Sequence, residues 1–482
     1  MDVQAKVKLL LQKGVLVSPE MLEQLAASEE DPSTLFSEES VLDRETTSSV
    51  ADDEEVKVIM SYDEPSQKRS VEDFVGYFNQ RFIALEGMLK YRQELQRLIS
   101  INKLLGKRDK EPVSIIGIVL EKSITQNNNI ILKLEDPTGI ISVLIHKNRS
   151  DIYELGKDIV LDEVIGVTGM LSEPGSTGGV IFFANSVVLP DIPIDKELKK
   201  SPKEGYAVFT GDIHLGSTLF LESEFKRFLA WLQGKEGNDE QKEIAKRVRY
   251  IFIPGDAVEG VGIYPGQEKD LTIADIKDQY GELAKYLKQI PSHIKIILCA
   301  GNHDAGRLSE PQPPLYKDFA EALWKIPNLH ILSNPCWVNV GSTVDFSGFD
   351  VLMYHGFSMT YYADKVGSLR AKGGMKRAEL IMKFLLQRRH LAPTHTSNLY
   401  IPDKRRDPLV IDKVPDFFVT GHIHRVSMGL YRNVSLLNCG CWSGLSSYQE
   451  KLGIIPQPAK VLVVNLQSRE VKVMNFLEEG PA

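Results

Sequence analysis

Five short motifs in the second half of the chain carry side chains that commonly bind metal ions. In chain order they are Gly211-Asp212-Ile213-His214, Gly255-Asp256, Gly301-Asn302-His303-Asp304, Tyr354-His355-Gly356 and Gly421-His422-Ile423-His424. Carboxylate, amide and imidazole groups together suit divalent transition metals better than calcium. In the Asp-x-His and His-x-His segments both side chains can point to one side of an extended chain, because strand side chains alternate with period two. The motifs therefore predict a metal site.

Each motif directly follows a strand-like run. The runs are YAVF, YIFI, IKIILC, DVLMY and DFFV, in a region where strands and helices alternate. This pattern is typical of α/β enzymes, whose sites form beyond the carboxyl ends of strands. Any one of these histidines could instead cap a helix or fill a polar core position, but five motifs after five strands favour one shared site. No role is expected for the histidines outside the motifs: His146, His293, His330, His390 and His395.

The region before these motifs has a different pattern. Five strand-like runs lie between Pro112 and Pro190, and turn signals such as Asn127-Asn128-Asn129 separate them. Five short strands in so few residues predict a closed barrel of the oligonucleotide/oligosaccharide-binding (OB) type over residues 111–200. A structural role for this barrel and a strand-binding role both remain open.

Three further segments precede the barrel. Residues 71–110 are expected to be helical, with Phe74, Tyr77 and Leu85 among the apolar residues at helical spacing. Residues 28–70 are acidic and rich in Ser and Thr, which predicts a flexible linker. Residues 1–27 are expected to form a small helical module.

Composition limits the classes of protein to consider. A chain of 482 residues is long enough for several domains. It has no apolar run of the roughly 20 residues that span a bilayer, and its beginning does not resemble a secretory signal. We therefore expect a cytoplasmic protein. Its four cysteines form no CxxC pair and are expected to be free thiols: Cys299, Cys336, Cys439 and Cys441. The net charge of −8 argues against bulk electrostatic coating of nucleic acid, but leaves a local basic groove open.

The combination GDIH, GD, GNHD, H and GHIH, over roughly residues 206–463, resembles the calcineurin-like metallophosphoesterase superfamily. The resemblance implies a multidomain chain in which residues 203–482 form an α/β metallophosphoesterase domain, a two-sheet sandwich flanked by helices. The barrel and the small helical module precede this domain.

The same resemblance implies a role for each motif residue. Asp212, His214 and His424 correspond to ligands of a first metal, and Asn302, His355 and His422 to ligands of a second. Asp256 corresponds to the ligand that bridges both metals. His303 corresponds to the catalytic histidine, and Asp304 is expected to orient it through a hydrogen bond.

The resemblance also implies a mechanism with two divalent metal ions. Two such ions about 3.5–4 Å apart polarise a phosphoryl group, activate water and stabilise the departing oxygen. His303 would donate a proton to the leaving group. The resemblance favours Mn²⁺, whereas ligand types alone leave Mg²⁺, Fe and Zn²⁺ open.

The order of helical module, acidic linker, barrel and phosphoesterase domain resembles the small-subunit family of archaeal family D DNA polymerases. That resemblance implies a proofreading 3′→5′ exonuclease that acts on a DNA 3′ end. It also implies a large polymerising subunit as partner, and no membrane.

Basic and aromatic residues near the motifs are candidates for substrate binding. Arg307 follows GNHD and Arg425 follows GHIH, whereas the 404–406 run (Lys-Arg-Arg) is better explained as solvated surface. Tyr361 and Tyr362 can stack on a terminal base or pack in the core.

Two other functions remain open. A small-substrate phosphatase or phosphodiesterase would share the fold but leaves the barrel without a role. A catalytically silent scaffold subunit would need the barrel but not the complete ligand set. A repair nuclease is disfavoured, because such enzymes usually begin with the phosphoesterase domain.

Overall fold

The computed structural model describes residues 56–65, 67–107, 111–172, 180–446, 449–450 and 454–477. The helical module expected at 1–27 and most of the linker expected at 28–70 lie outside these residues. All described residues belong to one compact unit that begins at Val56. Within this part of the chain, no helix combines the length and the apolar character needed to cross a membrane.

A closed five-stranded barrel follows two helices. The helices are α5 (Val71–Leu89) and α6 (Ile101–Leu105). The barrel strands are β2 (Val113–Ile124), β3 (Ile130–Asp136), β4 (Gly139–Ile145), β5 (Val164–Leu171) and β6 (Ile181–Val188), with α7 (Ser150–Lys157) between β4 and β5. The strands pair in the order β2-β3-β4-β6-β5. Alternate residues of β3 are buried, which fixes the register of this strand toward the barrel core.

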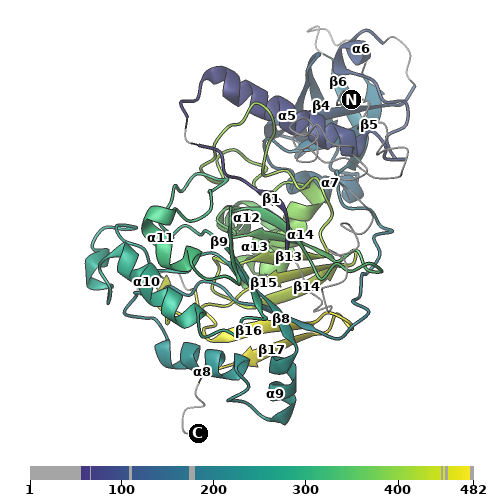
Figure 1. Ribbon diagram of the computed structural model, residues 1–482. Coiled ribbons are helices and arrows are strands. Elements are labelled where there is room, and N and C mark those ends of the chain that lie inside the picture. Colours follow the sequence, from purple (N-terminus) through teal and green to yellow (C-terminus); the bar gives the residue numbers. More distant parts are fainter. Residues whose placement is uncertain are drawn as a thin grey trace, which may run out of the picture. The chain divides into compact units, whose positions relative to one another are not determined.

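The rest of the described chain is built on two six-stranded mixed sheets (Figure 1). In spatial order, the first contains β1 (Lys57–Ser61), β11 (Cys336–Val340), β12 (Phe349–Tyr354), β13 (Phe417–Thr420), β15 (Val434–Asn438) and β14 (Ser427–Tyr431). The second contains β10 (Leu329–Leu332), β9 (Lys295–Cys299), β8 (Val248–Pro254), β7 (Tyr206–Phe209), β16 (Lys460–Asn465) and β17 (Val471–Asn475). Residues of both sheets share one buried cluster, which includes Phe209, Phe252, Val351 and Phe417. The two sheets therefore pack face to face.

Helices cover the outer face of each sheet. Those on the second sheet are α8 (Glu222–Leu232), α9 (Asp239–Lys246), α10 (Ile276–Leu287) and α11 (Lys317–Trp324), and they share a core with β8 and β9. Those on the first sheet are α12 (Met359–Lys365), α13 (Gly367–Ala371) and α14 (Ala378–Arg388), and they share a core with β12 and β13. Two short 3-10 turns complete the set, η1 (Gln267–Lys269) and η2 (Gly374–Arg377). The expected two-sheet sandwich with flanking helices is present in residues 206–475.

The end of the expected linker is part of this sandwich. Residues Lys57–Ser61 form β1, which pairs antiparallel with β11 at the edge of the first sheet. Val56 and Tyr62, on either side of β1, are buried. The prediction of a flexible linker up to residue 70 is therefore wrong for this segment, because its backbone pairs with a distant strand and its two flanking apolar residues are buried.

Candidate metal centre

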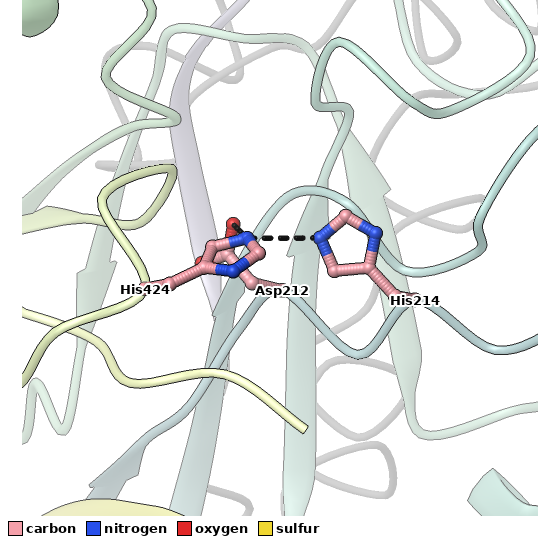
Figure 2. A group of neighbouring side chains, drawn as sticks. All are labelled: Asp212, His214 and His424. Atoms are coloured by element: carbon pink, nitrogen blue, oxygen red, sulfur yellow. Dashed lines mark hydrogen bonds and ion pairs between the residues drawn. The ribbon is translucent and has the colours of Figure 1, made fainter. Parts of the chain in front are cut away.

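A first group of three side chains comes together beyond the ends of β7 and β13. Asp212 and His214 follow β7, and His424 follows β13. Figure 2 shows the two imidazoles facing each other, with 3.0 Å between their Nε2 atoms and 3.5 Å from His424 Nε2 to Asp212 Oδ1. His214 donates its Nδ1–H to the Glu259 carboxylate at 2.8 Å, which leaves a lone pair on its Nε2 atom. These three residues form one candidate site for a cation.

A second group of three lies beyond β8, β12 and β13. It consists of Asp256, His355 and His422. His355 Nδ1 donates to the carbonyl of Pro254 at 2.8 Å, so the Nε2 atom of the neutral ring carries a lone pair. That Nε2 atom faces two oxygen acceptors, Asn302 Oδ1 at 2.9 Å and Asp256 Oδ2 at 3.3 Å. Converging acceptors of this kind fit a metal ion, which accepts electron density from all of them.

Asp256 faces both groups. Its Oδ2 atom lies 3.3 Å from His355 Nε2 and 3.8 Å from His214 Nε2. Its Oδ1 atom accepts a hydrogen bond from the backbone amide of His303 at 2.8 Å. This position is compatible with the bridging role expected for Asp256. The structure thus brings all seven expected ligands together, while metal binding itself stays a prediction.

The backbone of the expected ligands is strained. Five of them have φ angles in the left-handed region, which non-glycine residues rarely adopt. The angles are 49° for Asp212, 51° for His214, 48° for Asp256, 66° for His422 and 57° for His424. Strain of this kind persists only where surrounding structure enforces it, and it concentrates at functional sites.

The glycines beside the ligands allow the loops to approach closely. A Cβ atom on Gly301 would lie 2.2 Å from Asp256 Oδ1, and one on Gly421 would lie 2.6 Å from Asp212 Oδ2. Neither distance is possible for a real side chain. The glycines that accompany the motifs in the sequence therefore make room for carboxylates from neighbouring loops.

The site is buried, and its charged groups shift one another's pKa values. Although burial raises the pKa of Asp256, the nearby His355 and His303 hold it well below the usual range. Burial lowers the pKa of His422 to about 3. Burial also lowers the pKa of His355, but the Asp256 carboxylate raises it to about 9 overall. An ionised carboxylate in such a setting requires positive charge beside it, which protonated His355 supplies without metal and which metal ions would supply in its place.

His303 lies at the open side of the site, with 19% of its side chain exposed. Its Nδ1 atom donates to the backbone carbonyl of Glu259 at 2.9 Å, which leaves Nε2 as the free ring nitrogen. The prediction that Asp304 orients His303 is wrong. The Asp304 carboxylate instead accepts hydrogen bonds from the amides of Gly301 at 2.9 Å and Ala257 at 3.3 Å, and so braces the loop beneath the ligands. Burial raises the pKa of Asp304 to about 6.

Glu259 is the residue that sequence reasoning missed. Its carboxylate orients His214, and its backbone carbonyl orients His303. A carboxylate three residues after Asp256, in the segment GDAVE, was the available signal. Carboxylates that orient metal-binding histidines are a common second layer of such sites.

The expected substrate-binding arginines bond to backbone carbonyls. The Arg307 guanidinium donates to the Pro311 carbonyl at 2.6 Å and lies over the Tyr62 ring, whereas Arg425 donates to the Ile455 carbonyl. Such neutral partners do not compensate the positive charge of either arginine. Among the residues that the structure describes, neither arginine forms an ion pair, so both charges can bind an anionic group.

Tyr361 is half-buried and keeps its candidate role. Tyr362 is fully buried, and its hydroxyl bonds to Ser397, so this ring packs in the core and cannot stack on a base. In the 404–406 run, Arg405 pairs with Asp403 and Glu64, as expected of surface.

The sequence of this chain is similar to a known family and to several known proteins. Residues 208–427 match a family described as the B subunit of DNA polymerases alpha and epsilon. A DNA polymerase II small subunit from Methanocaldococcus jannaschii is 39% identical over 399 residues, covering 82% of this chain and 64% of that protein. The small subunit from Methanothermobacter thermautotrophicus is 38% identical, covering 82% and 77%, respectively. The small subunit from Pyrococcus abyssi is 39% identical, covering 84% and 63%.

The chain therefore belongs to the family of DNA polymerase II small subunits of archaeal family D polymerases. It spans slightly less than two thirds of the length of two of these relatives.

Proposed function

We propose that this protein is the proofreading 3′→5′ exonuclease subunit of a family D DNA polymerase. In this role it hydrolyses the phosphodiester of the 3′-terminal nucleotide with the help of two divalent metal ions. The observation that carries the proposal is the presence of two neighbouring groups of potential metal ligands, with Asp256 Oδ2 3.3 Å from His355 of one group and 3.8 Å from His214 of the other. Such a paired site suits phosphoester hydrolysis.

Each metal would have its own ligands. Asp212, His214 and His424 would hold the first, while His355, His422 and Asn302 would hold the second, with Asp256 shared. When bound, the metals supply Lewis acid activation of the phosphate and a lowered pKa of attacking water. Mn²⁺ is our preferred ion by family resemblance, and the mixed nitrogen and oxygen donors also accommodate Mg²⁺, Fe and Zn²⁺.

A side chain of the protein would then donate the proton that the leaving oxygen needs. The Glu259 carbonyl fixes the ring of His303 through Nδ1, so Nε2 points away from that anchor. In its protonated form, His303 can donate from Nε2 to the 3′-oxygen of the nucleotide that remains on the primer. The uncompensated guanidinium groups of Arg307 and Arg425 would contribute to phosphate binding.

The barrel supports a role in a polymerase over a small-substrate phosphatase. We infer that the closed five-stranded barrel, with the strand order β2-β3-β4-β6-β5, is of the OB type. OB-type barrels commonly bind nucleic acid, whereas a small substrate gives the barrel nothing to do. We infer that a large polymerising subunit is the partner and that DNA is the substrate. The four buried, free cysteines agree with the cytoplasmic location that we propose.

The first test is Mn²⁺-dependent shortening of a 3′-mismatched primer–template by the wild type, His303→Ala and Asp256→Ala. We expect stepwise loss from the 3′ end by the wild type, and a loss of at least about a hundredfold in rate for each variant. The assay is run with and without the large subunit. If the wild type shortens no DNA in either setting while still binding metal, the chain is a scaffold or acts on a small phosphoester.

A further inference from the structure

The loop that follows Glu259 presents an apolar surface beside the candidate metal centre. Residues 260–266 have the sequence GVGIYPG, which contains no charged side chain. Val261 is 47% exposed, Ile263 37% and Tyr264 39%. Contiguous exposed apolar surface that is rimmed by polar residues often marks a binding site.

The start of this loop touches the segment that carries His303. A Cβ atom on Gly260 would lie 2.1 Å from the carbonyl oxygen of His303, and it would also contact the Ile263 side chain at 2.9 Å. Gly260 has a φ angle of +76°, so only glycine fits this position without strain. Four residues of chain reach at most about 14 Å, so Tyr264 lies within about 14 Å of Gly260, which contacts the segment of His303.

The 260–266 loop is held in place by buried amide side chains. Gln267 is buried, accepts from the amide of Ile263 at 2.9 Å and donates to the Glu259 carbonyl at 3.1 Å. Gln279 is buried and accepts from the amide of Gly260 at 2.9 Å. The Glu259 carbonyl is also the group that orients His303, so the loop and the expected catalytic histidine share one anchor.

Tyr264 is fixed in orientation. Its hydroxyl donates to Asp270 Oδ2 at 3.0 Å, and the Asp270 carbonyl accepts from the amide of Thr218 at 2.8 Å. Thr218 belongs to the loop that follows His214. The ring therefore lies where two ligand-bearing loops meet, with its single polar atom already bonded.

We propose that the 260–266 loop, through Tyr264 and Ile263, is a stacking platform for the unpaired 3′-terminal base of the DNA substrate. This inference rests on the proposed exonuclease function. It identifies the feature that would select unpaired 3′ ends of DNA over paired ones. A nucleobase is the part of a nucleotide with an apolar face, and an ordered aromatic ring offers sequence-independent stacking. A base that is still paired cannot reach the platform, so frayed and mismatched ends are removed first.

The test removes the platform by mutation of Tyr264 and, separately, removes the terminal base by use of an abasic 3′ end. Single-stranded oligonucleotides end in thymidine or in a 3′-terminal abasic residue, and the full chain is assayed with the large subunit present. We expect the wild type to remove the thymidine end with a kcat/KM about tenfold higher than the abasic end. Tyr264→Ala should lose most of this preference by slowing the thymidine end alone. Tyr264→Phe should keep it, because the ring remains.

Each other result has a defined meaning. Tyr91→Ala, which removes an exposed tyrosine two residues after the end of α5, should leave both rates unchanged. Equal slowing of both ends by Tyr264→Ala, or no preference in the wild type, would overturn the platform while leaving the nuclease intact. No shortening of either oligonucleotide by the wild type would instead overturn the proposed function, and the platform with it.

Discussion

Glu259 supports two residues of the candidate site through two different groups. Its carboxylate accepts the Nδ1–H of His214, and its backbone carbonyl accepts the Nδ1–H of His303. Each bond selects the ring tautomer that turns Nε2 toward the reacting region. A carboxylate behind a ligand histidine also raises the basicity of that ligand.

At this scale we predict that Glu259→Gln weakens metal binding without unfolding the protein. Glutamine keeps the size and the backbone carbonyl, but it replaces the negative acceptor of His214 by a neutral one. The loss in Mn²⁺ affinity should be about tenfold to a hundredfold, measured by calorimetric titration of the metal-free protein. Glu268→Gln, on the exposed surface of η1, is the matched control and should bind Mn²⁺ like the wild type. Unchanged affinity in Glu259→Gln would show that this hydrogen bond does not tune the site.

The expected ligands were predictable from sequence because ligand chemistry depends on residue type. Asp, Asn and His residues after strand ends can be recognised directly in the sequence, and all seven expected ligands lie together in the structure. The orientation of His303 was not predictable in the same way. Its hydrogen-bond partner is a backbone carbonyl, which every residue possesses, so the residue type does not reveal the partner. The expectation that Asp304 orients His303 was wrong because two residues that are adjacent in sequence need not bond to each other. The Asp304 carboxylate bonds to the backbone amides of Gly301 and Ala257 instead.

At the level of elements, the strands that precede the motifs were predictable and β1 was not. The runs before Asp212, Asp256 and Asn302 are continuous apolar segments, as expected for strands buried on both faces. In contrast, β1 is five residues long and lies in an acidic region, and its pairing with β11 depends on a contact distant in sequence. Local pattern carries no information about such a partner.

The burial of Tyr62, directly after β1, leads to a stability prediction. The residue follows β1, is 1% exposed and donates its amide to Ser333 Oγ at 2.7 Å. Tyr62→Ala should lower the free energy of unfolding by about 3–5 kcal/mol, because it removes a large buried ring. Tyr91→Ala, whose ring is 81% exposed, should change it by less than about 0.5 kcal/mol. Denaturant unfolding measures both, and equal small effects would mean that the segment is a linker after all.

At the level of the whole described molecule, a buried charge joins α5, the barrel region and the sandwich. Arg81 on α5 pairs with Asp407 at 2.7 Å, and both side chains are essentially unexposed. The same guanidinium donates to the carbonyls of Pro393 at 2.6 Å and Asp162 at 3.4 Å. Sequence could not reveal this arrangement, since nothing in the helical pattern of α5 distinguishes Arg81 from an exposed arginine.

Removing Arg81 should therefore affect the whole unit. Arg81→Ala takes away the guanidinium that neutralises the buried Asp407 carboxylate and leaves it the imidazole of His390, and we expect a loss of about 3–5 kcal/mol in the free energy of unfolding. Arg97→Ala breaks an exposed pair with Glu111 and should cost no more than about 1 kcal/mol. Thermal and denaturant unfolding of the two variants would decide the matter. Similar small losses would mean that the buried pair does not hold the parts together.

The left-handed backbone at Asp212, His214, Asp256, His422 and His424 has a consequence for how such subunits evolve. Each of these residues is held in a conformation that glycine or asparagine would adopt more readily. Where such a subunit needs only its architecture, replacement of these residues by glycine would relieve the strain, although it would also remove hydrogen bonds such as the one from the His303 amide to Asp256. The five strained residues therefore cost this chain some stability, while they supply side chains that could hold metal ions.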